Sequence, residues 1–558
     1  MKKLLLPVLL AVAAVALRTP VAQAQTCAPS TSPIVNVPDG NLTGTVNWTR
    51  NNIYVLNGSV NVVDGAVLNI EDGTIIKGAT AVPGTGTTVA PAGRLVVERG
   101  GRIFARGTAA RPIVFTSNEP AGSRNRGNWG GVVILGRAPV AGGTPTIEGG
   151  VNRQYGGTDA ADNSGVLRYV RIEFSGIALL PDNEINGLTL GGVGSGTEID
   201  YVQVTGNGDD SFEWFGGTVN AKHLVSVNAT DDDFDTDLGF SGKVQFGLIV
   251  RNPNSWDAAG TSNAFESTTG NQALLTTAVF SNVTALLPGT PPAANRFNAA
   301  LLLRNNSSIS VFNSVFAGWP IGLALEGAGT QGSATNGGLV IKNTVLANTT
   351  NFQALGTGTT TYDVAGYFNA AGKENRVLAN ITALNLNADN LNFQNNNTPN
   401  YTLPASSPLV TGGAYTDAKL ADAFFDKTGT YVGAFGPAGV PNWAAGWTNF
   451  NPQTTCYNNA GQTLSNREVV NAPLQSLTVS PNPTEGAATL GFDVKRSTTA
   501  TVRVVDMLGR EVATVLNAGK LSAGPQRLSL PSTLAPGMYV ATVATSEALQ
   551  SVRFVVSK

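Results

Sequence analysis

An all-β protein, made of a parallel β-helix (a solenoid of stacked coils) followed by a small C-terminal β-sandwich, is the fold that the sequence predicts. The composition suits short strands joined by tight turns, because the 558 residues include 65 glycines and only 13% are charged. Between about residues 35 and 403, short β-rich runs alternate with Gly, Asn and Asp turns, and helical spacing is nearly absent. Part of this stretch overlays itself at a constant offset of 22 residues, which is what stacked coils produce.

The first 24 residues have the features of a secretory signal peptide. Lys2 and Lys3 precede an apolar run, Leu4–Leu17, and Ala22-Gln23-Ala24 is a small-x-small cleavage site. A membrane anchor would need about 20 apolar residues, and Arg18 ends this run earlier. We therefore expect export through the periplasm and no transmembrane segment in the mature chain. The formal net charge of −2 provides no basic field, so no nucleic-acid partner is expected.

Two cysteines, Cys27 and Cys456, flank the predicted coils. An exported chain can oxidise such a pair. A bridge requires the segment after the coils to fold back along them, whereas two unpaired thiols require nothing of that segment. Both outcomes stay open at this point.

Residues 25–403 are assigned to the β-helix with its N-terminal cap, and the offset of 22 residues predicts its register. It superposes Val202 on Leu224 and Phe246, Val204 on Ser226 and Leu248, Phe212 on Phe234 and Trp256, Glu213 on Asp235 and Asp257, and Tyr201 on His223 and Gln245. Coils about 4.8 Å apart, a dozen to fifteen in number, would make a rod of roughly 60–70 Å. The aromatic series that begins at Phe212 is expected in the core and His223 is expected to be an ordinary strand residue. Trp129, Trp214, Trp256 and Tyr201 are candidates to stack on sugar rings, and the place of Trp214 stays undecided.

The opening coils, residues 61–78, follow a Gly-Ala-x-Leu-x-Ile-x-x-Gly-Thr-x-Ile rhythm, which residues 127–134 continue. Over most of residues 40–400 the chain resembles right-handed β-helix surface proteins in this respect. The resemblance implies a right-handed parallel β-helix and specifies little about activity.

The 22-residue period is lost after residue 403. We expect residues 404–470 to form a C-terminal cap over the last coil and a linker, because an uncovered coil would leave an open edge. In residues 471–558, alternating apolar strands joined by Gly and Pro turns predict a β-sandwich.

Four motifs give this last domain a more specific resemblance. They are Ser480-Pro481-Asn482-Pro483, the Asp-x-x-Gly-Arg turn at 506–510, the Gly-x-Tyr strand at 537–539 and a last strand that ends in Lys558. In this order at the C-terminus they resemble the sorting domain of the type IX secretion system of Bacteroidota. The resemblance implies the type IX machinery as a partner, export to the outer cell surface or the medium, cleavage of this domain and often attachment to surface lipopolysaccharide. An ordinary immunoglobulin-like module is the alternative.

Eight acidic residues in two successive coils are the densest chemical feature of the chain. They are Asp209, Asp210 and Glu213, followed by Asp231, Asp232, Asp233, Asp235 and Asp237. The register stacks the first set on the second, and carboxylates about 4.8 Å apart repel by roughly 3–4 kcal/mol per pair at an effective dielectric near 20. Calcium would offset this repulsion, because it prefers oxygen ligands. Nearby Lys or Arg, raised pKa values or full solvation of the turns are the alternatives. The spacing is not that of an EF-hand, since Val244 stands where the closing Glu should be.

A catalytic interpretation would use Asp209, Asp210 and Asp232. Gly208-Asp209-Asp210 is similar to the paired aspartates of β-helix polygalacturonases, in which two carboxylates act as acid and base. The rest of that pattern is missing, because His223, the one histidine, lies in Lys222-His223-Leu224 and not between glycines. A lyase would need calcium and an Arg or Lys base, for which Lys222, Lys243 and Arg251 are candidates.

Two functions therefore follow from the sequence. The first is a secreted or surface-attached, non-enzymatic protein in adhesion, glycan binding or extracellular matrix structure, stabilised by calcium. The alternative is a polysaccharide-degrading enzyme, a glycoside hydrolase or lyase, that uses the acidic residues.

Overall fold

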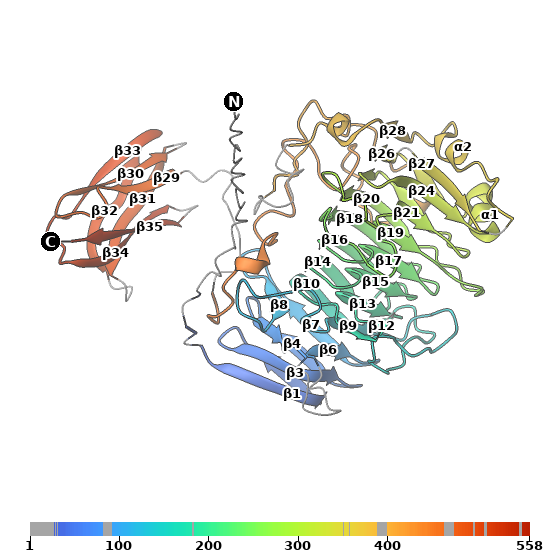
Figure 1. Ribbon diagram of the computed structural model, residues 1–558. Coiled ribbons are helices and arrows are strands. Elements are labelled where there is room, and N and C mark those ends of the chain that lie inside the picture. Colours follow the sequence, from blue (N-terminus) through green and yellow to red (C-terminus); the bar gives the residue numbers. More distant parts are fainter. Residues whose placement is uncertain are drawn as a thin grey trace, which may run out of the picture. The chain divides into compact units, whose positions relative to one another are not determined.

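The structure is a computed structural model that describes residues 27, 29–30, 32–81, 92–180, 183–349, 351–356, 358–387, 399–462, 474–494, 497–506, 511–545 and 549–557 (Figure 1). The signal peptide expected at residues 1–24 lies outside the described residues. Two compact units are formed, one by the chain up to Trp443 with Asn449–Leu464, the other by Ala444–Thr448 with Ser465–Lys558. Among the described residues, no helix has the length and apolar character needed to cross a membrane.

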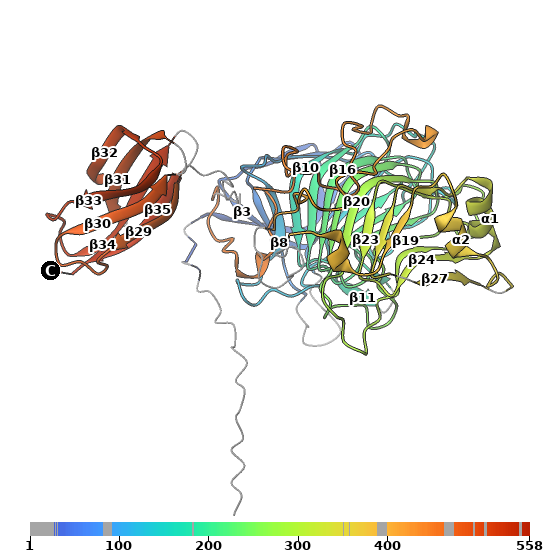
Figure 2. The ribbon, with the colours of Figure 1, turned by 90° about the horizontal axis from the view of Figure 1, so that it is seen from above.

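The first unit is a parallel β-helix, as predicted, whose strands stack in three rows that we call faces A, B and C (Figure 2). Face A consists of the second half of β3 (Ile53–Val62), β6 (Arg94–Val97), β9 (Val132–Leu135), β13 (Leu188–Gly191), β15 (Phe212–Phe215), β17 (Phe234–Asp237), β19 (Phe265–Ser267), β21 (Ala299–Leu303), β24 (Ile321–Glu326) and β27 (Asn351–Leu355). Every pairing along this face is parallel, so each coil adds one strand to it.

Faces B and C share several long strands that bend from one face into the other. Face B begins with β2 (Thr45–Trp48), β4 (Val67–Ile70) and β7 (Arg102–Arg106). Face C begins with the first half of β1 (Ile34–Leu42), the first half of β3, β5 (Ile75–Gly78) and β8 (Ile113–Ser117), and the second half of β1 belongs to face A. Both continue through β10 (Gly165–Glu173), β14 (Glu198–Thr205), β16 (Asn220–Val227), β18 (Lys243–Val250) and β20 (Val279–Leu286). Face B ends in β22 (Ser310–Phe312) and β25 (Ile341–Lys342), and face C in β23 (Val315–Ala317), β26 (Val345–Ala347) and β28 (Arg376–Leu378).

Short elements outside these rows complete the first unit. They are the hairpin β11 (Ala178–Leu180) with β12 (Asn183–Glu184), the helices α1 (Ala328–Asn336) and α2 (Val364–Asn369), and the 3₁₀ turns η1 (Ile381–Leu384), η3 (Ala418–Leu420) and η4 (Pro452–Thr454).

The predicted 22-residue register is confirmed for one step and wrong for the next. Val202 pairs with Leu224 and Glu213 with Asp235, as expected. The third coil differs: Leu224 pairs with Gly247 and not Phe246, Phe234 with Phe265 and not Trp256, and Asp235 with Glu266 and not Asp257. The coils are not equal in length, because the loops between the strands absorb extra residues while the strands keep their pairing.

Aromatic side chains form continuous stacks in this β-helix. In the core, the ring of Phe234 lies 5.5 Å from that of Phe212 and 5.3 Å from that of Phe265. Trp214, whose place the sequence left undecided, is fully buried beside them, as is Trp129, so neither can stack on a sugar. A second stack runs along the corner between faces B and C, where His223 lies 4.2 Å from Tyr201 and 5.1 Å from Phe246, and not over Gln245.

A segment that we call the strap, residues 399–443 and 449–462, lies along the corner between faces B and C. The side chain of Gln245 both donates to and accepts from the backbone of Asp426, at 2.8 and 2.7 Å, and Gln203 does the same with Asn449, at 2.9 and 2.8 Å. We expected a cap over the last coil in residues 404–470. Arg376 of β28 (Arg376–Leu378) does donate to the backbone of Pro408 at 2.9 Å, and the hydrogen bonds of Gln245 and Gln203 show that the segment also runs along the side of earlier coils. A buried polar group needs a partner, and here the strap supplies partners to the coils of β14 and β18.

Near its C-terminal end the strap is held by a disulfide between Cys27 and Cys456, which decides the question that the sequence left open. Close to it the hydroxyl of Tyr457 donates to the carboxylate of Glu173, at 2.7 Å. Arg124 donates to the carbonyl oxygens of Pro452 and Thr455, at 2.7 and 2.9 Å. The strap is thus fixed covalently at one end and by hydrogen bonds along its length.

Replacing both Cys27 and Cys456 with serine should loosen the end of the strap while the coils stay folded. Loss of a native disulfide typically costs about 2–5 kcal/mol, and here the loss falls on the segment that the bridge holds. We expect faster chymotryptic cleavage after Phe450 and Tyr457, which flank Cys456, and a lower melting temperature. The same protein with its cysteines intact is the control; equal cleavage rates in the two would show that the hydrogen bonds alone hold the strap.

The second unit contains two antiparallel sheets with one hydrophobic core, as expected for residues 471–558. One sheet has β29 (Leu474–Ser480), β30 (Ala488–Val494) and β33 (Gly524–Leu530), and the other has β31 (Thr498–Asp506), β32 (Glu511–Leu521), β34 (Gly537–Thr545) and β35 (Leu549–Val556). Most of the Asp-x-x-Gly-Arg turn, residues 507–510, lies outside the described residues.

Candidate metal centre

Asparagine and aspartate side chains hold the turns that lead into face A. The Asp210 carboxylate accepts a hydrogen bond from the backbone N–H of Asp232 at 2.7 Å, and the Asp232 carboxylate accepts one from Asn263 at 2.5 Å. The Asn263 side-chain oxygen accepts from Ala299 at 3.0 Å in the next coil. Each side chain thus bonds to the backbone of the following coil. Asp210 and Asp232 are only 6% and 4% exposed, so their first role is to build these turns.

A row of carboxylates continues on the strands themselves. Glu213 of β15, Asp235 of β17 and Glu266 of β19 are direct neighbours in the parallel register. One oxygen each of Asp210, Glu213 and Asp235 lie within 4.8 Å of one another, and so do oxygens of Asp209, Asp210 and Asp231. We call Asp209, Asp210, Glu213, Asp231, Asp232 and Asp235 the acidic cluster. Asp210 belongs to both groups of three, so it joins them.

Three further acids approach this cluster from segments that the sequence did not point to. Glu148, from the loop between β9 and β10, approaches Glu213, and after burial its charge is the largest cause that raises the pKa of Glu213. Glu184 of β12 raises the pKa of Asp209, and Glu266 raises that of Asp235. Neither Glu148 nor Glu184 lies on a repeated strand, so no period in the sequence could have placed them here.

Burial raises the pKa values of the whole cluster, and the mutual repulsion of the carboxylates raises them further. The pKa of Asp231 is raised to about 7. Those of the other five members are raised well above the usual range, in each case first by burial and then by neighbouring carboxylates. This is the expected response of acids that are removed from water without a counter-charge.

The cations near the cluster are engaged at its edges. Arg251 pairs with Asp233 at 3.3 Å, and both side chains are fully buried. Arg304 pairs with Glu266, also at 3.3 Å. Within the cluster one carboxylate oxygen of Asp231 and one of Asp235 are buried and make no hydrogen bond to any described residue. Orphaned buried acceptors of this kind call for an explanation such as an ion.

Three of the eight predicted ligands lie outside both groups of three: Asp232, Asp233 and Asp237. Asp233 accepts hydrogen bonds from Ser226 at 2.5 Å and from Arg251 at 3.3 Å. Asp237 accepts from the backbone of Leu238 at 2.5 Å, and burial raises its pKa to about 6.

The candidate bases of the enzymatic interpretation are also engaged elsewhere. The ammonium group of Lys222 lies 4.8 Å from the ring centre of Phe424, and Lys243 pairs with Asp422 at 3.0 Å. His223 contacts Asp200 at 2.7 Å. Two of the three catalytic candidates, Asp210 and Asp232, accept hydrogen bonds from the backbone of the next coil. Among the described residues, no such hydrogen bond holds the carboxylate of Asp209.

Known proteins resemble the chain in two regions. A family described as the pectate-lyase-like β-helix domain matches residues 40–376, and one described as the secretion system C-terminal sorting domain matches residues 478–557. No curated protein matches the chain. Among solved structures, full-length tailspike protein 2 of the Escherichia coli O157:H7 bacteriophage CAB120 aligns at 10% identity and a TM-score of 0.21. That alignment covers 90% of this chain and 65% of the tailspike, and a likeness this weak says nothing about activity.

Proposed function

The chain belongs to the family of pectate-lyase-like β-helix domains, and on that premise we propose that it is a non-enzymatic, calcium-stabilised protein in adhesion, glycan binding or matrix structure. Its C-terminal sorting domain marks it as secreted or displayed on the outer surface. In that location a stiff β-helix with long exposed faces offers binding surface, and the medium supplies the cation.

The orphaned carboxylate oxygens of Asp231 and Asp235 are the observation that carries the calcium proposal. They lie in two adjoining groups of acids whose oxygens approach within 4.8 Å. Calcium takes six to eight oxygen ligands at about 2.3–2.6 Å, with carboxylates preferred. One calcium ion would lie between Asp209, Asp210 and Asp231, or between Asp210, Glu213 and Asp235. On binding it, the carboxylate oxygens would move closer together, and the charge of the ion would offset their mutual repulsion.

The enzymatic alternative has less support. Asp210 and Asp232 each use one carboxylate oxygen to accept a hydrogen bond from the backbone of the next coil. A carboxylate fixed in this way suits the coordination of an ion better than the role of an acid or base that must exchange protons with a substrate. Lys222, Lys243 and Arg251 contact other partners. Closely spaced, buried carboxylate oxygens favour the binding of an ion over the binding of a sugar chain.

Calcium should raise the melting temperature of the protein, and a variant with Asp210→Asn and Glu213→Gln should lose this response. Both substitutions keep the shape and an acceptor oxygen, so the turns should stay folded. At a calcium concentration 100 times the Kd, the stabilisation should be about 2.7 kcal/mol. The measurement is thermal unfolding with added calcium or with chelator, together with calorimetric titration.

The matched control is Asp64→Asn, an exposed acid on the opening coils that pairs with Arg137. It should respond to calcium as the unaltered protein does. No calcium response in the unaltered protein would refute the proposal, as would an equal response in the double variant. Turnover of an acidic polysaccharide that disappears with Asp210→Asn would instead support the enzyme.

A further inference from the structure

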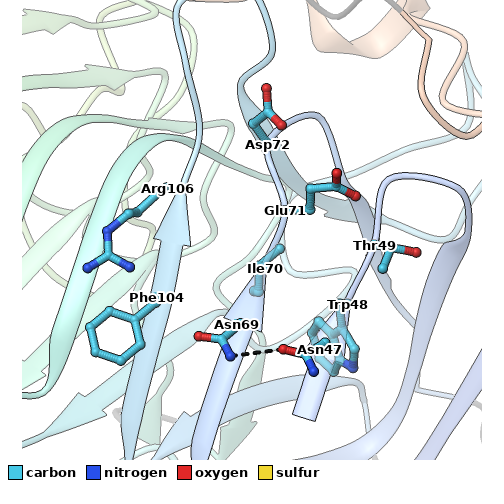
Figure 3. A pocket seen from close by; sticks show the side chains of 9 residues that line it. All are labelled: Asn47, Trp48, Thr49, Asn69, Ile70, Glu71, Asp72, Phe104 and Arg106. Atoms are coloured by element: carbon cyan, nitrogen blue, oxygen red, sulfur yellow. Dashed lines mark hydrogen bonds between the residues drawn. The ribbon is translucent and has the colours of Figure 1, made fainter. Parts of the chain in front are cut away.

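A groove on face B crosses the opening coils, far along the sequence from the acidic cluster. It has a volume of about 360 Å³ and opens over β2, β4 and β7 (Figure 3). The lining residues are Asn47, Trp48, Thr49, Asn69, Ile70, Glu71, Asp72, Phe104 and Arg106. Trp48 and Ile70 are 4% and 3% exposed, so they belong to the core beneath it, and the polar side chains and Phe104 form its accessible walls.

Three outward side chains stand in one row across the groove. Asn47, Asn69 and Phe104 pair directly in the parallel register of β2, β4 and β7, so successive members lie about 4.8 Å apart. The Asn69 side-chain N–H donates to the Asn47 oxygen at 2.9 Å (Figure 3). Within the described part of the chain, this bond leaves the Asn47 N–H₂ group and the Asn69 oxygen without a partner. A donor beside an acceptor is what adjacent sugar hydroxyls require, because each hydroxyl both donates and accepts.

The end of the row carries an aromatic ring and a cation. Phe104 is half-buried, and the guanidinium of exposed Arg106 lies 4.5 Å from the centre of its ring. The described residues provide no acidic partner for Arg106. The two acids of the groove, Glu71 and Asp72, both pair with Arg50, and a second cation, Arg111, lies 3.8 Å from Asp72, so their charges are already balanced. The positive charge of Arg106 is therefore available to pair with an anionic group of a ligand.

We propose that this groove binds an anionic oligosaccharide. The amides of Asn47 and Asn69 contact hydroxyl groups, Phe104 packs against the apolar side of a sugar ring, and Arg106 contacts a carboxylate or sulfate. This inference rests on the proposed function, because it names the place and the ligand class of the glycan binding proposed above. Trp129 and Trp214, which the sequence offered for stacking on a sugar, are buried in the core. In the proposed groove Phe104 is the accessible aromatic residue that takes this role.

The test is binding of defined hexasaccharides to the full chain in calcium, measured by calorimetry. The probes are a carboxylated one from hyaluronan, a sulfated one from heparin and a neutral one from chitin. Arg106→Gln should weaken binding of the anionic probes tenfold or more, since a charged hydrogen bond contributes about 1.5–3 kcal/mol, and should leave the neutral probe unchanged. Asn47→Ala should weaken all three. Arg102→Gln, an exposed arginine of the same strand outside the groove, is the matched control and should bind as the unaltered protein does.

The outcomes separate this inference from the function on which it rests. If the unaltered chain binds a probe and Arg106→Gln and Asn47→Ala bind it equally well, the glycan site lies elsewhere and only the groove is refuted. A neutral probe that binds as tightly as both anionic ones refutes the anionic class. If the unaltered chain binds none of the probes, the groove proposal falls, while the calcium response still decides the proposed stabilisation.

Discussion

In the presence of a chelator, the protein should lose stability as the pH rises from about 4 to about 8, and calcium should abolish this loss. The acidic cluster and its neighbours Asp233 and Asp237 are the cause. The pKa of Asp231 rises from 3.8 to about 7 on folding, and those of Asp233 and Asp237 rise from 3.8 to about 6. Between these values the folded chain holds protons that the unfolded chain has released, so stability decreases with increasing pH.

The sign is opposite to that of most carboxylates, which favour folding when they are ionised. The stability that these acids contribute is fully present below pH 3.8 and is lost as the pH rises through about 6 to 7. Each pKa unit corresponds to about 1.4 kcal/mol, so the set should produce a change on the order of several kcal/mol. Calcium prefers the ionised carboxylates and releases their protons, and its stabilisation should therefore grow with pH.

The measurement is chemical unfolding at a series of pH values, with chelator and with calcium. In chelator the double variant Asp210→Asn with Glu213→Gln should show a smaller slope and should be more stable than the unaltered protein near pH 8. A stability that rises with pH in chelator would mean that the acids are paired or solvated, and it would remove the physical basis for the ion.

The sequence was sufficient to predict one facing pair of acids in the first two coils of the acidic region, but not the pair that follows it. The pairing of Glu213 with Asp235 followed from a constant coil length, and the structure confirms it. Glu266 was missed because the next coil contains a longer loop, and the extra residues displace the register from Asp257. Glu148 comes from a loop that no repeat describes, so only tertiary structure could bring it to Glu213.

The contacts between the strap and the coils could not be predicted from the sequence period, for a related reason. Gln203 and Gln245 stand on β14 and β18, where the pattern marks them only as polar strand residues. Each is fully buried, and its amide is satisfied by the strap backbone of Asn449 or Asp426. A pattern of apolar and polar residues shows that such a side chain is polar, but it does not show which distant backbone will meet it.

Replacing Arg251 with methionine should destabilise the coil that carries the cluster by about 3–5 kcal/mol, since it leaves the Asp233 carboxylate buried without its cation. Arg251 and Asp233 are both fully buried, at 3.3 Å. The guanidinium also donates to the backbone oxygens of Asp231 at 2.6 Å and Thr230 at 3.1 Å. These bonds fix the turn that positions the orphaned oxygen of Asp231.

The same substitution should therefore weaken calcium binding, although Arg251 contacts Asp233 and not the orphaned oxygens. Arg153→Met is the matched control: its pair with Glu98, at 2.6 Å, lies outside the cluster, the arginine side chain is 42% exposed, and such a pair contributes roughly 0–1 kcal/mol. Chemical unfolding measures the first effect and calorimetric titration with calcium the second. Equal losses of stability for the two variants would show that the buried pair does not organise the turn, whereas a lower calcium affinity for Arg251→Met alone would link the core of the β-helix to its metal centre.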